Sequence, residues 1–233
     1  MPSPAENLAF ELEVIFCVQG VASPLLANIY INRFLKYWRL SGCGEAFRAH
    51  VVSYADDFVI LSRGRAAEAL AWTKAVMTKL GLTLNEAKTS LKDARQERFS
   101  FLGYSFGPHY PYNPSARLYL YMSASPSKRS VQQLKTKVRD LLVPGNNDPW
   151  LEVRDDLNRL LRGWSSYFNL GSPVAAFRSV DHYVRERARG FLARRHKVAG
   201  RGNRRFTYDE IHRNRGVLCL ERLPRPASLW ALR

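Results

Sequence analysis

Residues 50–61 read His-Val-Val-Ser-Tyr-Ala-Asp-Asp-Phe-Val-Ile-Leu, with the adjacent carboxylates Asp56 and Asp57 between two apolar runs. β-Branched and aromatic residues on both sides of an acidic turn predict a β-hairpin. Two neighbouring carboxylates repel each other, and a bound Mg²⁺ ion, which prefers oxygen ligands, would offset that repulsion. Phosphoryl transfer with two metal ions requires such ligands. Alternatively, the two residues only favour the turn, where aspartate is common.

The segments around the hairpin predict a mixture of helices and strands. Ser23-Pro24 begins a helix, with serine as the N-cap and proline at the first helical position, and Ser41-Gly42 ends it. The Ala-rich residues 66–80 form a second helix, and residues 99–104 and 118–122 are typical of strands. This half of the chain therefore has the pattern of an α+β fold.

The second half of the sequence is predicted to be helical. Residues 126–143 form one helix, which Pro144-Gly145 ends. Residues 150–168 repeat apolar side chains at helical spacing, so this segment is strongly amphipathic. Residues 177–192 form a third helix, whose other faces carry arginines. The fold class predicted for the whole chain is α+β, an antiparallel sheet with helices followed by a helical domain.

Net charge separates the two halves. Lys and Arg total 36 against 20 Asp and Glu, which gives a formal net charge of +16. Residues 1–124 carry 13 basic and 10 acidic residues, whereas residues 125–233 carry 23 and 10. Such an excess favours a polyanionic partner, most often nucleic acid, although a membrane surface would also fit the charge alone. The small polar residues at 123–126 suit a domain boundary.

Cysteine usage and hydropathy narrow the class of protein. Cys17, Cys43 and Cys219 form no C-x-x-C pair, so we expect neither a disulfide framework nor a zinc site, and we expect a cytoplasmic location. The uncharged window at 14–32 contains Pro24 and several amide side chains, which argues against a membrane span, and we expect no membrane partner. The sequence leaves the oligomeric state, including a homodimer, open.

Further motifs flank the hairpin in a fixed order. Residues 19–30 (QGVASPLLANIY) precede it, and residues 81–85 (GLTLN), Lys88-Thr89 and residues 101–104 (FLGY) follow it. In this order and spacing, the set resembles the palm of reverse transcriptases encoded by group II introns. Residues 158–168 (Asn-x-x-Leu-Arg-Gly-Trp-x-x-Tyr-Phe) resemble the maturase-specific domain of the same proteins, which is also called the thumb or X domain.

The resemblance implies a role for each matching residue of the palm. Asp56 would bind Mg²⁺ with Asp57 as its acidic neighbour, and both would be catalytic. Tyr54 and Ala55 would line the primer end. The other matching residues, which would lie near the nucleotide, the template or the primer, are Gln19, Gly20, Lys88 and Gly103. For Lys88, a solvated surface charge is the alternative interpretation.

The sequence departs from the family in two places. The family's Gln-Gly-Gly loop is Gln19-Gly20-Val21 here, so one glycine that would allow close backbone approach is missing. Family members also place the fingers and a metal-binding aspartate upstream, but no aspartate precedes Asp56 in this chain. The alternating residues 10–16 are compatible with a strand, although they do not resemble the expected motif. We interpret the chain as the C-terminal part of such an enzyme.

Arginine is concentrated in the helical half. Its guanidinium group forks onto phosphates and stacks on unpaired bases, so these side chains are candidates for RNA contacts, the alternative being a solvated helix face. The candidate RNA-binding residues are Arg162, Arg178, Arg185, Arg189, Arg194, Arg195, Arg204 and Arg205. Three histidines, His182, His196 and His212, lie among them without metal-ligand spacing, and we expect them to be surface or RNA-facing residues.

These expectations divide the chain into a non-native or truncated N-terminus (1–18), a partial reverse transcriptase palm (19–124), a maturase-specific helical domain (125–215) and a C-terminal tail (216–233). By resemblance, a polymerase palm that is incomplete for catalysis would be joined to a domain that binds intron RNA and template-primer. The protein would then act in RNA splicing and intron mobility. Two alternatives stay open, a non-enzymatic RNA-binding splicing cofactor and an inactive remnant of a mobile element.

Overall fold

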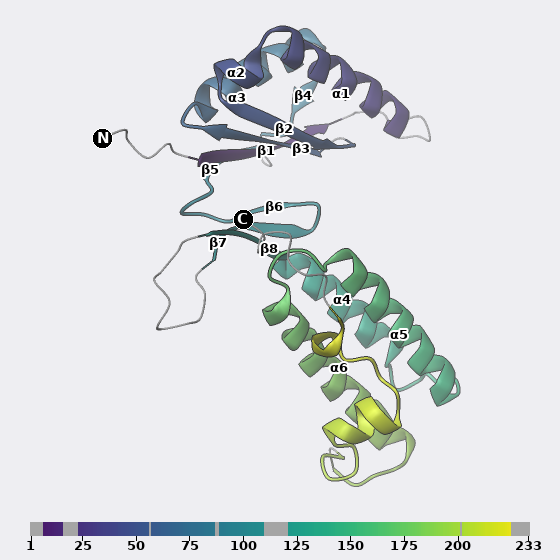
Figure 1. Ribbon diagram of the computed structural model, residues 1–233. Helices are drawn as coiled ribbons and strands as arrows, with labels where there is room; N and C mark the ends of the chain where they lie inside the picture. Colours follow the sequence, from purple (N-terminus) through teal and green to yellow (C-terminus); the bar gives the residue numbers. More distant parts are fainter. Residues whose placement is uncertain are drawn as a thin grey trace, which may run out of the picture. The chain divides into compact units, whose positions relative to one another are not determined.

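The structure is a computed structural model that describes residues 7–15, 23–55, 57–86, 89–109, 121–200 and 202–224 (Figure 1). The chain forms two compact units. The first comprises residues 1–102 and 106–123, and the second comprises residues 103–105 and 124–233. Among the described helices, none is long and apolar enough to cross a membrane.

The first unit is built on an antiparallel sheet. Its strands are β1 (Asn7–Ile15), β2 (Ala49–Tyr54), β3 (Asp57–Arg63), β4 (Thr83–Leu84) and β5 (Ser90–Asp93). The strand order is β2-β3-β1-β4, and β5 also pairs with β1. The predicted hairpin is present as β2 and β3, whose pairing ends at Tyr54↔Asp57. The strand β1 comes from the segment expected to be non-native, yet it lies inside the sheet between β3 and β4.

Helices cover one face of this sheet (Figure 1). The helices α1 (Ser23–Leu40) and α3 (Ala66–Lys79) occupy the two predicted segments, and a short helix, α2 (Cys43–Ala46), follows α1. Because side chains alternate along a strand, Phe58 and Ile60 of β3 share the face that packs against these helices, and both are fully buried. Apolar area removed from water stabilises the unit by about 25 cal/mol per Å².

The opposite face of β3 contributes to a second, smaller core. Val59 packs there with Ala94, Phe99 and Phe101. The last two belong to β6 (Phe99–Phe101), which pairs with β7 (Tyr104–His109), and β8 (Tyr121–Pro126) completes a three-stranded sheet. The predicted strand at 99–104 is therefore split by a turn. Leu102 and Gly103 form that turn with left-handed φ angles of 51° and 77°.

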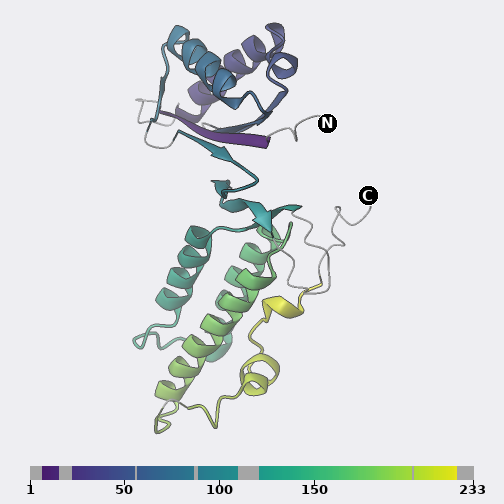
Figure 2. The ribbon, with the colours of Figure 1, turned by 90° about the vertical axis from the view of Figure 1, so that its left-hand side faces the viewer.

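The second unit is helical, as predicted (Figure 2). Its three long helices are α4 (Lys128–Leu141), α5 (Trp150–Tyr167) and α6 (Val174–Arg195). The helix α4 begins two residues later than expected because Pro126 ends β8. Ser127 is the N-cap instead, and its Oγ accepts a hydrogen bond from the backbone N–H of Ser130 at 3.1 Å.

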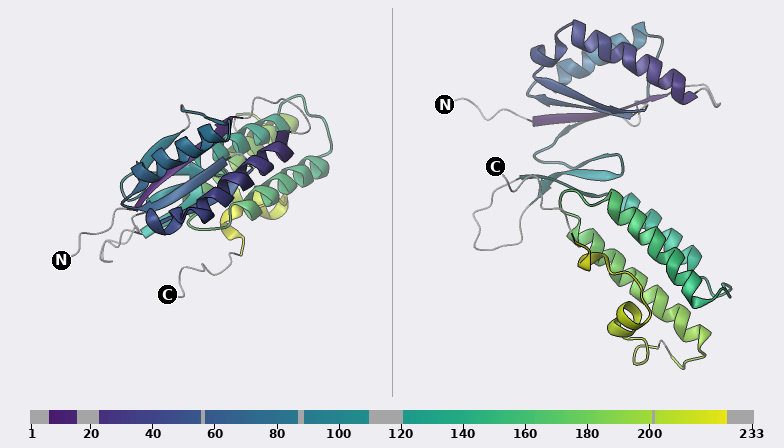
Figure 3. Two further views of the ribbon diagram at one scale, coloured as in Figure 1. Left: turned by 90° about the horizontal axis from the view of Figure 1, so that it is seen from above. Right: turned by 45° about the vertical axis from the view of Figure 1, so that its right-hand side comes forward.

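After α6 the chain returns along that helix (Figure 3). The return segment contains a π-helix, η1 (Glu210–Asn214), and a 3-10 turn, η2 (Leu220–Arg222), which the sequence pattern did not predict. The buried carboxylate of Asp181 on α6 accepts hydrogen bonds from the backbone N–H groups of Leu220 and Glu221, both at 2.9 Å. The described part of the expected tail, residues 216–224, is thus fastened to the helical unit at this turn.

Candidate active-site hairpin and nucleic-acid interface

The turn of the β2–β3 hairpin presents the first candidate site. Tyr54 is 65% exposed at the end of β2, and Ala55 follows it with a left-handed φ of 51°. A residue other than glycine rarely adopts this conformation, and such strained backbone is concentrated at functional sites. Asp57 begins β3 and is half-buried. Asp56, the predicted metal ligand, lies outside the described residues.

Strand pairing places one further acidic residue opposite Asp57. In the register of β1 with β3, the Cα partner of Asp57 is Glu13. Residues directly opposite each other in an antiparallel pair are neighbours in the sheet. A glutamate on β1 therefore lies beside the start of β3, next to the hairpin turn.

The described residues do not by themselves make a metal centre. No group of three His, Cys, Asp or Glu side chains that could hold a metal ion occurs within the described part of the chain. Of the predicted Mg²⁺ ligands only Asp57 is described, so Mg²⁺ binding at Asp56 and Asp57 stays a prediction. The other predicted nucleotide and primer residues, Gln19, Gly20 and Lys88, also lie outside the described residues.

Gly103, the last predicted primer residue, has a packing role that the sequence did not indicate. A Cβ atom added to Gly103 would lie 2.9 Å from the Oγ of Ser130 and 3.2 Å from the Cζ of Phe168. Its carbonyl oxygen accepts hydrogen bonds from the N–H of Ser127 at 2.9 Å and from the hydroxyl of Ser130 at 2.8 Å. The glycine therefore brings the turn against α4 and the end of α5, whatever its role toward a primer.

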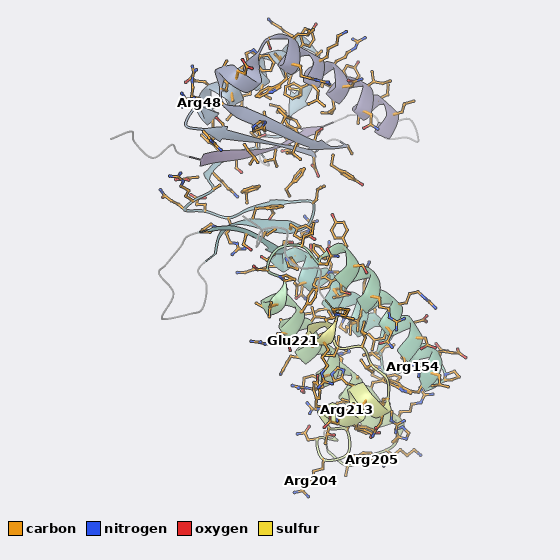
Figure 4. All side chains as sticks on the ribbon, viewed as in Figure 1. Arg48, Arg154, Arg204, Arg205, Arg213 and Glu221 are labelled. Carbon is orange, nitrogen blue, oxygen red and sulfur yellow. The ribbon has the colours of Figure 1, made fainter. Side chains whose placement is uncertain are left out.

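The predicted RNA-binding arginines fall into two groups, those exposed to solvent and those paired with an acidic side chain. Arg162, Arg194, Arg195, Arg204 and Arg205 are exposed on the helical unit. Figure 4 shows Arg204, Arg205 and Arg213 together at the end of this unit that carries η1. This end of the unit therefore presents several cations to solvent.

Three of the predicted arginines are engaged by acidic neighbours. Arg178 donates from Nε to the Glu221 carboxylate at 3.0 Å. Arg185 lies 3.8 Å from Glu186, and Arg189, only 17% exposed, is ion-paired with the same carboxylate. The expectation that Arg189 lies on an exposed face is wrong, because its guanidinium folds back along α6 onto Glu186.

Positive charges also converge around His196, at the C-terminal end of α6. Partial burial lowers the pKa of His196, and the positive charges of Arg215, Arg205 and Arg195 lower it further. Arg215 was not predicted as a functional residue, because its contribution depends on the return of the chain after η1. No sequence periodicity links residue 215 to residue 196.

The buried groups beside the return segment are structural in character. The hydroxyl of Tyr208 lies 3.2 Å from the sulfur of Cys219, which in turn lies 3.3 Å from the Asp181 carboxylate. The hydrogen bond with Cys219, together with burial, raises the pKa of Tyr208 to about 12. Burial likewise raises the pKa of Cys219, so this thiol stays protonated and unreactive at neutral pH.

An acidic hairpin on an antiparallel sheet, followed by a basic helical unit, is the arrangement that the resemblance to group II intron reverse transcriptases leads us to expect. The comparisons with known families agree. Residues 14–106 match the family "Reverse transcriptase (RNA-dependent DNA polymerase)", and residues 131–208 match the family "Group II intron, maturase-specific domain". The chain therefore carries a reverse transcriptase domain followed by a group II intron maturase-specific domain, which confirms the resemblance and the predicted α+β fold class. No curated protein matches the chain.

Proposed function

We propose that this protein binds group II intron RNA through its helical unit and thereby assists RNA splicing. The observation that carries the proposal is the distribution of charge, because residues 125–233 hold 23 basic and 10 acidic residues, and the maturase-specific match lies within them. The exposed side chains of Arg194, Arg204 and Arg205 supply cations for the phosphate backbone. If these arginines only formed a solvated helix face, so large an excess of positive over negative charge would not be needed.

Filter binding of the full chain to a group II intron RNA, across a salt series, tests this proposal. Reversing Arg194 and Arg204 to Glu should weaken binding and flatten the dependence of log K on log salt, by about 0.7–0.9 for each phosphate that is no longer neutralised. The matched control reverses Arg33 and Lys36, which are exposed on α1 of the other unit. An equal weakening of binding by both pairs would refute an RNA site on the helical unit.

The reverse transcriptase domain supports a second function, RNA-directed DNA polymerisation and hence intron mobility. In this proposal Asp56 and Asp57 hold Mg²⁺, which would supply charge stabilisation for phosphoryl transfer, while Tyr54 positions the primer end. No aspartate precedes Asp56 in the chain, and the residue paired with Asp57 is Glu13. We therefore expect this chain by itself to be catalytically incomplete, because a metal site that lacks one ligand positions the ion poorly.

The division of the chain follows from the same proposal. The partial palm would occupy residues 19–124 and the maturase-specific domain residues 125–215, with the return segment up to residue 224 fastened to it through Asp181. Such a protein would act in the cytoplasm, where cysteines stay reduced, and Cys43 and Cys219 are both free and buried.

A further inference from the structure

The cations at the end of α6 are organised around one aromatic ring. The Phe206 side chain is completely buried, and the guanidinium carbons of Arg205 and Arg215 lie 5.8 and 5.9 Å from its ring centroid. The ring of His196 lies 5.9 Å from the same centroid. Arg195 precedes His196, and its Nη2 donates to the carbonyl of Asn147 at 3.2 Å. Three guanidinium groups and an imidazole thus share one small region within the helical unit.

The charges that act on His196 come from each of the elements packed around it. Arg195 belongs to α6 itself, Arg205 precedes η1, and Arg215 follows η1. The acid of this cluster is Glu210 of η1, which accepts a hydrogen bond from the Nε of Arg215 at 3.0 Å and from the amide of Asn214. One carboxylate for three guanidinium groups leaves the region positively charged, so it would attract an added anion.

We propose that Arg195, His196, Arg205 and Arg215 bind a phosphate group of the RNA backbone, and that His196 takes up a proton when the phosphate binds. The proposal rests on the RNA-binding function above and names one contact point within it. Arginine pairs with phosphate through its planar fork, and cation–π contacts with the Phe206 ring help to position two of the guanidinium groups. The imidazolium then adds a fourth cationic donor, whose positive charge exists only in the bound state.

The direction of the proton linkage follows from the charges. In the free protein partial burial and the three guanidinium groups both disfavour a further positive charge, so the pKa of His196 lies below its ordinary value. A bound phosphate cancels that repulsion and raises the pKa of His196. A group that gains a proton on binding makes the affinity rise as the pH falls, in the window between the free and the bound pKa. Binding should therefore be tighter at pH 5.5 than at pH 8.

The first experiment measures the site without RNA. The histidine resonances of the full chain are titrated by NMR in chloride and in inorganic phosphate at equal ionic strength. The pKa of His196 should rise in phosphate, whereas that of His182, an exposed histidine on the same helix, should not. Arg205→Gln should reduce the rise. An identical titration of His196 in both salts would overturn the proposal.

The second experiment separates this inference from the proposed function. Binding of intron RNA by the full chain is compared at pH 5.5 and pH 8 for wild type, His196→Gln and the control His182→Gln. Each unit by which phosphate raises the pKa corresponds to a tenfold gain in affinity, so we expect about a tenfold effect in wild type and in the control. The His196→Gln variant should show no such effect of pH.

The outcomes of the second experiment distinguish the two proposals. If RNA binding is tight and the affinity of His196→Gln depends on pH as that of wild type does, the proton linkage is refuted. The proposed RNA-binding function is then unaffected. Absence of RNA binding, with the NMR shift in phosphate intact, would refute the proposed function and leave a site for free phosphate.

Discussion

Gly103→Ala should destabilise the helical unit by about 2–5 kcal/mol. Gly103 has a φ of 77°, a left-handed conformation that costs a residue with a Cβ about 1–2 kcal/mol. The new methyl group would also lie 2.9 Å from Ser130 Oγ and 3.2 Å from Phe168 Cζ, and overpacking of this kind costs about 1–3 kcal/mol. Ser130 cannot turn away freely, because its hydroxyl donates to the Gly103 carbonyl oxygen at 2.8 Å.

The matched control is Gly200→Ala in the same unit. Gly200 has a φ of 72°, and a Cβ placed there meets no atom within 4 Å, so this variant carries the conformational cost alone. Urea unfolding of both full-length variants, followed by far-UV circular dichroism, isolates the packing contribution as the difference between them. Equal destabilisation of the two variants would refute the packing role of Gly103. A defect in primer binding without extra destabilisation would instead support the primer contact that the family resemblance implies for Gly103.

Four further predictions address the carboxylates and the sheet. Asp181→Ala should lower the free energy of unfolding by about 3–5 kcal/mol, because two backbone N–H groups lose a charged acceptor. If urea unfolding showed a change below about 1 kcal/mol, this carboxylate would not be what holds η2. This chain alone should not extend a primer on an RNA template, and Mg²⁺-dependent extension that Asp56→Asn abolishes would overturn that expectation. The backbone amides of β1 should exchange slowly with deuterium, because β1 pairs with β3 over seven residues, from residue 7 to residue 13. Rapid exchange would instead support the expectation from the sequence that this segment is non-native. Hydrogen bonds from Asn214 and Arg215 lower the pKa of Glu210 in the folded protein. The ionised Glu210 side chain therefore stabilises the fold above its unfolded pKa, and this stabilisation is lost as the pH falls through the lowered value. The urea midpoint of Glu210→Gln should therefore depend less on pH than that of wild type between pH 5 and pH 3.

The elements that could be predicted from the sequence are those with a strong local pattern of residue types. The hairpin at 50–61 has apolar runs on both sides of an acidic turn, and residues 150–168 repeat at helical spacing, so both were located within a few residues. The motifs likewise indicated the two families in the correct order. Local pattern was sufficient because each of these elements is specified by residues that lie close together in the sequence.

The features that escaped prediction depend on interactions between distant residues. The π-helix at 210–214 and the turn at 220–222 have no strong periodicity, and the Asp181 carboxylate fixes the second of them from 39 residues away. Arg189 was expected to be exposed because its spacing places it off the apolar stripe, but an ion pair with Glu186 covers it. The cluster around Phe206 likewise exists only after the chain has returned along α6.

The attachment of η2 to Asp181 closes a loop in the helical unit. The chain leaves α6 at Arg195, carries Arg204, Arg205 and Arg213, and is tied again to the same helix at Asp181, about 21 Å from Arg195 at 1.5 Å per residue. Both ends of this basic loop are thus anchored on one rigid element. The loop loses most of its conformational entropy when the protein folds, so little further loss of entropy opposes RNA binding. Releasing one anchor should weaken RNA affinity even if every arginine is retained.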